Sequence, residues 1–183
     1  MPNFGMPYFL EDKTGKLTGS EFDDMHDRMH FVYRCTARDS TRTAYMIYNT
    51  TRGTEASFTK PIAALDFGPG NSLGSICFDP QVNIPMKKYL TKTSTLGSSK
   101  DRKFVASDGQ EYRWRWRYKE DQEWTCTNGR DYLIAYYNLK PAGEPEYENS
   151  AGCMLTVEEP YGNLAGDMLA SLMIMRHIAA YNI

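Results

Sequence analysis

The sequence has few cysteines and no long hydrophobic run. Its four cysteines, Cys35, Cys77, Cys126 and Cys153, are widely spaced, and no basic segment followed by an apolar stretch opens the chain. This pattern excludes a small disulfide-stapled scaffold and predicts reduced thiols in a cytoplasmic protein. The longest apolar run, residues 168–175, is less than half of the roughly 20 residues that a transmembrane helix needs. We therefore expect no transmembrane segment.

The chain also lacks an excess of charge of either sign and the common motifs of enzymes. Its 21 Lys and Arg residues nearly cancel its 23 Asp and Glu residues, which argues against a nucleic-acid-binding protein. The only histidines are His26, His30 and His177, and no Gly-x-Ser-x-Gly elbow or catalytic cysteine motif is present. The glycine-rich residues 68–74 lack the Lys-Ser/Thr pair of a phosphate loop. We expect no cofactor, and the sequence alone does not identify a reaction.

Short segments rich in Val, Ile, Thr, Tyr and Trp, separated by turn residues, predict a mainly β protein. The predicted strands cover residues 30–37, 44–51, 57–67, 75–78, 86–91, 103–107, 110–119, 123–127, 130–139 and 153–158. Pro85 suggests that the segment after it is an edge strand or a bulge. Asp108-Gly109 and Asn128-Gly129 each predict a tight hairpin. Because residues 1–183 contain no internal repeat and no clear linker, we expect a single domain.

Residues 167–181 are rich in strong helix formers and predict one C-terminal helix, with Asp167 as its N-cap. Only Ser171, Arg176 and His177 interrupt its apolar surface. A helix that is apolar on all sides must be surrounded by protein. We therefore expect an antiparallel β-barrel that encloses this helix, since closure buries the helix and also removes edge strands.

The residues around the first predicted hairpin resemble a family of small fungal proteins of unknown function. The shared pattern is Phe104, Asp108, Gly109, Tyr112 and Trp114, followed by an apolar strand and the terminal helix. The layout is similar to the tubby-like fold of tubby C-terminal domains and phospholipid scramblases. That resemblance implies binding of phosphoinositide head groups or action at membranes, but no ligand-binding residue of those proteins can be matched here. Fold similarity alone does not transfer function.

Residues 112–119 alternate aromatic and cationic side chains, which a strand would place on opposite faces. The predicted ligand-binding residues are the four cations Arg113, Arg115, Arg117 and Lys119. Single-stranded nucleic acids need aromatic and basic groups on one surface, so this separation favours an anionic lipid head group or phosphorylated small molecule instead. The alternative is an ordinary strand, with its aromatics inward and its cations outward, in which the cations pair with acids such as Glu120, Asp121 and Glu123 or with neighbouring strands.

A second polar cluster precedes the first predicted strand. On a helix, His26 and His30 would share one face, and Asp23 and Asp27 could complete a metal site. The downstream ligand and the general-base Glu of known two-histidine metal motifs are missing from this segment. The alternative is a polar loop that leads into the first strand.

These observations support two hypotheses. The first is a non-catalytic intracellular binding module that recognises an anionic ligand or a protein partner through the cationic strand. The second is an enzyme of unknown reaction, with a pocket at the barrel rim in which His26, His30 and the nearby aspartates act as metal or acid/base groups. The sequence leaves the oligomeric state open.

Overall fold

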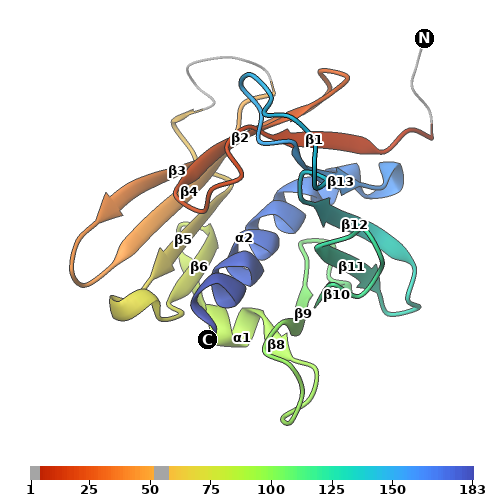
Figure 1. Cartoon of the computed structure of the whole chain (residues 1–183). Helices are drawn as coiled ribbons and strands as arrows, with labels where there is room; N and C mark the ends of the chain where they lie inside the picture. Colours follow the sequence, from red (N-terminus) through yellow and green to blue (C-terminus); the bar gives the residue numbers. More distant parts are fainter. Residues whose placement is uncertain (1–4, 52–57) are drawn as a thin grey trace.

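The chain forms one antiparallel β-sheet curled around a C-terminal helix (Figure 1). The computed structural model describes residues 5–51 and 58–183. In the first half the strands are β1 (Tyr8–Asp12), β2 (Gly19–Asp24), β3 (His30–Arg38), β4 (Thr43–Asn49), β5 (Ala63–Phe67), β6 (Ser75–Asp79) and β7 (Val82–Pro85). The second half contains α1 (Met86–Tyr89), β8 (Thr91–Lys92), β9 (Asp101–Val105), β10 (Glu111–Trp116), β11 (Trp124–Asn128), β12 (Leu133–Asn138), β13 (Cys153–Val157) and α2 (Ala165–Tyr181). The 3-10 helices of the described residues include η2 (Pro69–Asn71) and η3 (Glu159–Leu164).

The order of the strands brings the first and last strands of the chain together. It runs β7-β6-β5-β4-β3-β2-β1-β13-β12-β11-β10-β9-β8. β1 pairs antiparallel with β13, from Tyr8 opposite Val157 to Asp12 opposite Cys153. This pairing joins two meandering halves into one sheet. Figure 1 shows the halves on either side of α2, which lies within the curve of the sheet.

The sheet is not closed into the expected barrel. β7 and β8 are its end strands, and neither pairs with a further strand within the described residues. Helix α1 lies between these ends and contacts β6, β7 and β9, and its Met86 and Tyr89 are buried. Pro85, the last residue of β7, has no N–H to continue a ladder, and the chain turns directly into α1. Apart from its last residue, the strand predicted for residues 86–91 is therefore wrong.

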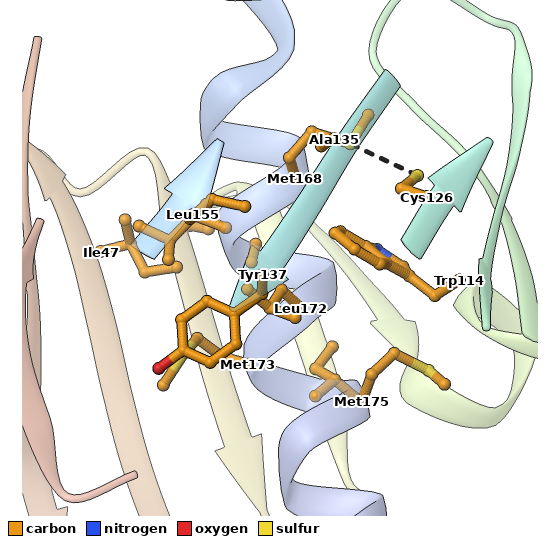
Figure 2. Packing of buried hydrophobic residues seen from close by; sticks show 14 of the residues in the cluster. Ile47, Trp114, Cys126, Ala135, Tyr137, Leu155, Met168, Leu172, Met173 and Met175 are labelled. Carbon is orange, nitrogen blue, oxygen red and sulfur yellow. Dashed lines mark hydrogen bonds between the residues drawn. The ribbon is translucent and has the colours of Figure 1, made fainter. Parts of the chain in front are cut away.

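α2 is buried on nearly all its sides, as its apolar sequence predicts. Its buried residues are Ala165, Asp167, Met168, Leu169, Ala170, Ser171, Leu172, Met173, Ile174, Met175, His177 and Ile178. Figure 2 shows side chains of the sheet around the helix, among them Ile47, Trp114 and Leu155. Each buried aliphatic side chain contributes about 1.5–3 kcal/mol relative to an exposed one, so helix and sheet depend on each other for stability.

The start of α2 differs from the prediction. Its N-cap is Leu164, which caps no amide with its side chain, and the amide of Ala165 donates to the carbonyl of Gly162 in η3. Asp167 lies in the first turn and instead accepts hydrogen bonds from Ser107. The N-cap role predicted for Asp167 is therefore wrong, because η3 continues directly into the helix.

Most of the other predicted strands are confirmed, with shifts at their ends. The strand predicted for residues 57–67 corresponds to β5, which begins at Ala63, and residue 57 lies outside the described residues. Both hairpins are present. Gly109 has the expected positive φ of 76°, whereas in the second hairpin the left-handed residue is Asp131, with a φ of 64°, rather than Gly129. β1 and β2 are additional strands, and β2 occupies part of the segment interpreted as a polar loop.

Candidate functional site

The cationic strand of the sequence is β10, which lies between β9 and β11. Tyr112 and Trp114 are buried on its inner side, while Arg113 and Arg115 alternate with them on the outer side. The alternation ends with the strand at Trp116. The next residue, Arg117, has a φ of 47°, which turns the chain out of the sheet.

The four predicted ligand-binding residues therefore divide into two pairs. Arg113 and Arg115 line a hollow of about 490 Å³ on the outer face of β9, β10 and β11. Arg117 and Lys119 line a separate hollow of about 480 Å³ beside the loop that follows β10. The first pair stands on a rigid sheet, and the second on an exposed turn.

Each arginine of this segment has an acidic partner. Arg113 donates from Nε to Asp101 Oδ1 over 2.7 Å, and Arg117 donates from Nε to Glu123 Oε2 over 3.1 Å. Glu123 near in sequence and Asp101 on the neighbouring strand β9 are thus the kinds of partner that the alternative of an ordinary strand predicts. Asp101 lies directly opposite Arg115 in the β9–β10 register, two residue pairs along from the pair that Arg113 forms with Lys103.

Arg115 is the most enclosed of these cations. Its side chain is 11% exposed and forms an ion pair with Asp131, whose own side chain is 61% exposed. The guanidinium also donates to Thr127 Oγ1 over 3.0 Å and lies 3.3 Å from the centre of the Tyr118 ring. The hydrogen bond from Arg115 holds the pKa of the Asp131 carboxyl below its usual range. The buried Nε of Arg115 has no hydrogen-bond partner among the described residues.

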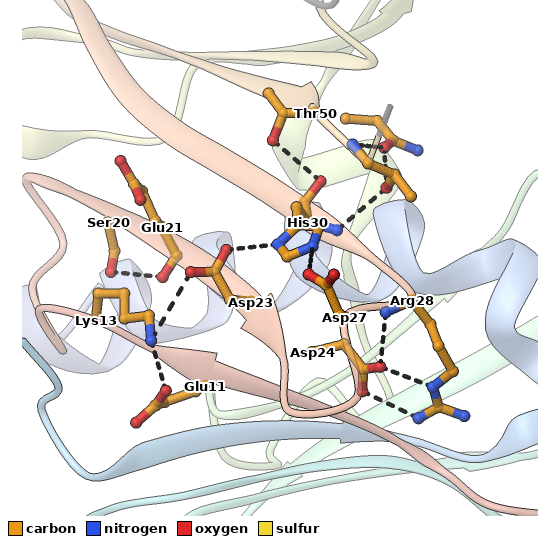
Figure 3. Close-up of polar contacts among 12 residues, drawn as sticks. Glu11, Lys13, Ser20, Glu21, Asp23, Asp24, Asp27, Arg28, His30 and Thr50 are labelled. Atoms are coloured by element: carbon orange, nitrogen blue, oxygen red, sulfur yellow. Dashed lines mark hydrogen bonds and ion pairs between the residues drawn. The ribbon is translucent and has the colours of Figure 1, made fainter. Parts of the chain in front are cut away.

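The second predicted cluster forms an ion-pair network on the β2–β3 hairpin (Figure 3). His30 contacts Asp23 Oδ1 through Nδ1 over 2.9 Å and Asp27 Oδ1 through Nε2 over 2.8 Å. The hydrogen bond with Asp23, followed by that with Asp27, raises the pKa of His30. Lys13 also lies 3.8 Å from Asp23. Both ring nitrogens of His30 thus face carboxylates, which is the arrangement of a protonated imidazolium.

His26 does not join this network. The segment is a hairpin rather than a helix, so His26 and His30 do not share a helical face. The His26 ring is exposed and lies edge-on to Phe9, with the ring centres 6.3 Å apart. Among the residues that the structure describes, no group of three or more His, Cys, Asp and Glu side chains is arranged to hold a metal ion.

A third location was not indicated by the sequence. Asp167, Ser107 and Tyr89 line a cavity of about 640 Å³ at the start of α2. They come from three distant segments, and Tyr89 belongs to the helix that replaces a predicted strand. An Asp at the start of a predicted helix does not by itself indicate a binding site, because Asp is common at exposed helix starts.

The chain belongs to a family of unknown function, DUF6593, whose model matches residues 17–179. The match includes the β2–β3 hairpin, the cationic strand and nearly all of α2. No curated protein matches the chain, and no solved structure matches it either. In the described part of the chain, every helix is too short or too polar to cross a membrane.

Proposed function

We propose that this chain is a non-catalytic binding module for an anionic, phosphate-bearing ligand, and that its site is the hollow on the outer face of β9–β11. The observation that carries this proposal is Arg115, a guanidinium in the wall of the hollow whose acidic partner, Asp131, is an exposed residue of the turn between β11 and β12. A phosphate group that displaces Asp131 would keep the charge-assisted hydrogen bond of this guanidinium, which is worth about 1.5–3 kcal/mol. Arginine also suits phosphate because its planar fork donates two hydrogen bonds at once.

The hollow around Arg115 contains further cations, each paired with an acid. Lys103 and Arg113 line it together with Thr127, and Lys103 pairs with Glu111 over 3.1 Å while Arg113 pairs with Asp101. An anionic ligand therefore has to exchange with these carboxylates. Arg115 forms its ion pair with Asp131, which lies in the exposed turn between β11 and β12. The Asp131 side chain can therefore move aside without disturbing a strand. An arriving phosphate group would replace this carboxylate and take over its contacts.

The source of the phosphate distinguishes two forms of this proposal. A sheet wrapped around an apolar C-terminal helix supports the tubby-like interpretation, and with it a lipid head group at a membrane surface. The small size of the hollow equally suits a phosphorylated metabolite. The enzyme hypothesis has less support, because the contacts of His30 with Asp23 and Asp27 leave neither ring nitrogen open to a substrate.

The test measures binding of inositol trisphosphate by calorimetry, and of phosphatidylcholine vesicles with and without a phosphoinositide by co-sedimentation. We expect Arg115→Gln to weaken binding at least tenfold, because it removes charge-assisted hydrogen bonds worth about 1.5–3 kcal/mol. Asp131→Asn should strengthen binding, since it removes the competing carboxylate. Binding should also weaken as salt is added.

Arg42→Gln is the matched control, because Arg42 is also an arginine paired with an acid, Asp66. Arg42 lies in the turn between β3 and β4, in the other half of the sheet from the proposed site. The Arg117→Gln variant separates the two hollows. Binding that is insensitive to Arg115→Gln and Asp131→Asn, or that depends on Arg117 alone, would contradict the proposed site. Binding of vesicles but not of the soluble phosphate would assign the ligand to a lipid surface.

A further inference from the structure

The cavity at the start of α2 lies where the two halves of the open sheet face each other. Both halves of the sheet contribute to its walls. The first half provides Phe31 on β3, Ile62 just before β5, Phe78 on β6 and Ile84 on β7, and the second half provides Val105 on β9. These side chains make the walls predominantly apolar. A volume of about 640 Å³ is within the range of small-molecule sites in proteins.

The mouth of the cavity opens to solvent between exposed residues of both halves. Asn49 at the end of β4 and Asn163 in η3 are exposed lining residues. Val105 is also 55% exposed. A molecule can therefore enter without unfolding a strand, and its apolar part would be shielded from water inside.

The lining of the cavity includes a largely buried carboxylate. Asp167 accepts hydrogen bonds from the Ser107 amide over 3.0 Å and from the Ser107 hydroxyl over 2.9 Å. No Lys, Arg or His in the described residues forms an ion pair with it, and burial raises the pKa of its carboxyl. A buried carboxylate with no cationic partner attracts a hydrogen-bond donor or a positive charge.

A second polar group lines the same cavity. Tyr89 is only 8% exposed, and its hydroxyl is buried without a hydrogen-bond partner among the described residues. The rings of Phe78 and Phe104 both pack against Tyr89, each with its centre 5.6 Å away, so the phenol is held in place. Burial, and next the charge of Asp167, raises the pKa of Tyr89, as expected for a phenol near that carboxylate. Buried hydroxyls in native proteins nearly always have a partner.

We propose that this cavity binds an amphipathic small molecule, whose apolar body fills the space between the two halves of the sheet. Its hydrogen-bond-donating head group, a hydroxyl or an ammonium, lies between Asp167 and Tyr89. A hydroxyl head donates to the Asp167 carboxylate and accepts from the Tyr89 phenol, whereas an ammonium donates to both. A carboxylate head is repelled by Asp167. This preference is opposite to that of the anion-binding site proposed on β10, so the two proposals are independent.

The experiment compares three probes that share one hydrocarbon chain: decanol, decylamine and decanoate. Binding is followed through the methyl resonances of Ile62 and Ile84, which line the cavity, with buried Ile134 as an internal reference. We expect decanol and decylamine to shift the two cavity methyls and to bind at least tenfold more tightly than decanoate. No shift with any probe, or equal affinity for all three, would overturn the proposal.

Two conservative variants test the head-group assignment. Tyr89→Phe should leave the unliganded protein as stable or more stable, since it removes an unpaired hydroxyl, yet weaken decanol binding roughly 2–10-fold. Asp167→Asn can still accept from the Ser107 amide and should abolish the discrimination against decanoate. Unchanged affinities in both variants would leave only an unspecific apolar cavity and would refute the assigned head group.

A third variant tests the location with little risk to folding. Val105→Trp places a large side chain at the mouth and should block all three probes. Val82→Trp is its matched control, because Val82 is similarly exposed, at 52%, and does not line the cavity. Equal binding in the two tryptophan variants would overturn the proposed entry.

Discussion

At the scale of single residues, two histidines have opposite electrostatic surroundings. His30 lies between the carboxylates of Asp23 and Asp27, and these contacts raise its pKa. His177 on α2 is stacked on Phe67, with the ring centres 3.8 Å apart, and its Nε2 lies 2.8 Å from the carbonyl of Asn71. Burial lowers the pKa of His177. The first ring is thus stabilised when charged and the second when neutral.

The raised pKa of His30 predicts a pH-dependent contribution to stability. Its folded-state pKa exceeds the unfolded value of about 6.5, so the stabilisation is fully present below that pH and is lost as the pH rises through the folded-state pKa. We expect His30→Gln to lower the free energy of unfolding by about 0.5–1 kcal/mol near pH 5 and by much less near pH 9. Urea denaturation at both pH values measures the difference.

The control for this comparison is His26→Gln, because His26 is exposed and lies outside the ion-pair network. The acid sensitivity of His177 is common to all the variants and cancels between them. An equal loss of stability at the two pH values would mean that His30 contributes through packing rather than charge.

At the scale of elements, the polar residues of α2 are compatible with burial because each has a partner in the sheet or its loops. Arg176 donates from Nη1 to buried Asp12 over 3.3 Å. Ser171 accepts a hydrogen bond of 2.8 Å from the indole Nε1 of Trp114 and donates to the carbonyl of Asp167 over 2.7 Å. The helix is thus fixed in rotation by specific hydrogen bonds, which uniform apolar packing would not achieve.

Removing the Ser171 hydroxyl tests this role. Ser171→Ala should lower the free energy of unfolding by about 1–3 kcal/mol, because the buried indole N–H of Trp114 loses its acceptor. The measurement is urea denaturation, with Trp114→Phe as the reference background. In that background the indole N–H is absent, so Ser171→Ala should cost clearly less. Equal costs in both backgrounds would show that the hydrogen bond does not orient the helix.

Elements with strong local signals could be predicted from the sequence. The Asp108-Gly109 turn and the apolar run of α2 carry their own conformational preferences, and both are confirmed. β1 and β2 could not be predicted, because acids such as Asp12 and Asp24 occupy buried positions that alternation assigns to apolar residues. Asp12 is compatible with burial because the Tyr137 hydroxyl donates to it over 2.7 Å and Arg176 over 3.3 Å, contacts across 125 and 164 residues of sequence that no local pattern encodes.

The same limit applies to the candidate sites. Alternation along β10 correctly predicted the outward direction of Arg113 and Arg115, since it depends only on the strand repeat. It could not predict the hollow or the unpaired Nε of Arg115, which depend on neighbouring strands. The position of Tyr89 depends on a single-turn helix held by tertiary packing, which has too few residues for a helical repeat to be detected.

At the scale of the whole molecule, the weakest part of the sheet is in the middle of the sequence. The pairing of β1 with β13 places both terminal strands at the centre of the sheet, while the end strands β7 and β8 flank α1. β8 has only two residues, and most of β7 is exposed. Within the described residues the seam between the halves is therefore occupied by α1 and the cavity beside it, and no hydrogen-bonded ladder closes it.

This arrangement predicts two classes of amide hydrogen exchange. Amides of β7, α1 and β8 should exchange through local opening of the seam, whereas those of β1 and β13 should require global unfolding. Ser171→Ala discriminates between the two, because it lowers global stability without touching the seam. It should speed exchange in β1 and β13 and leave exchange in β7 and β8 unchanged.

A ligand in the cavity should act on the seam instead. Decanol bound there should slow amide exchange in α1, because it contacts Tyr89 of that helix. If the amides of β7 are as protected from exchange as those of β13 and respond equally to Ser171→Ala, the seam does not open independently. The molecule then unfolds as one cooperative unit.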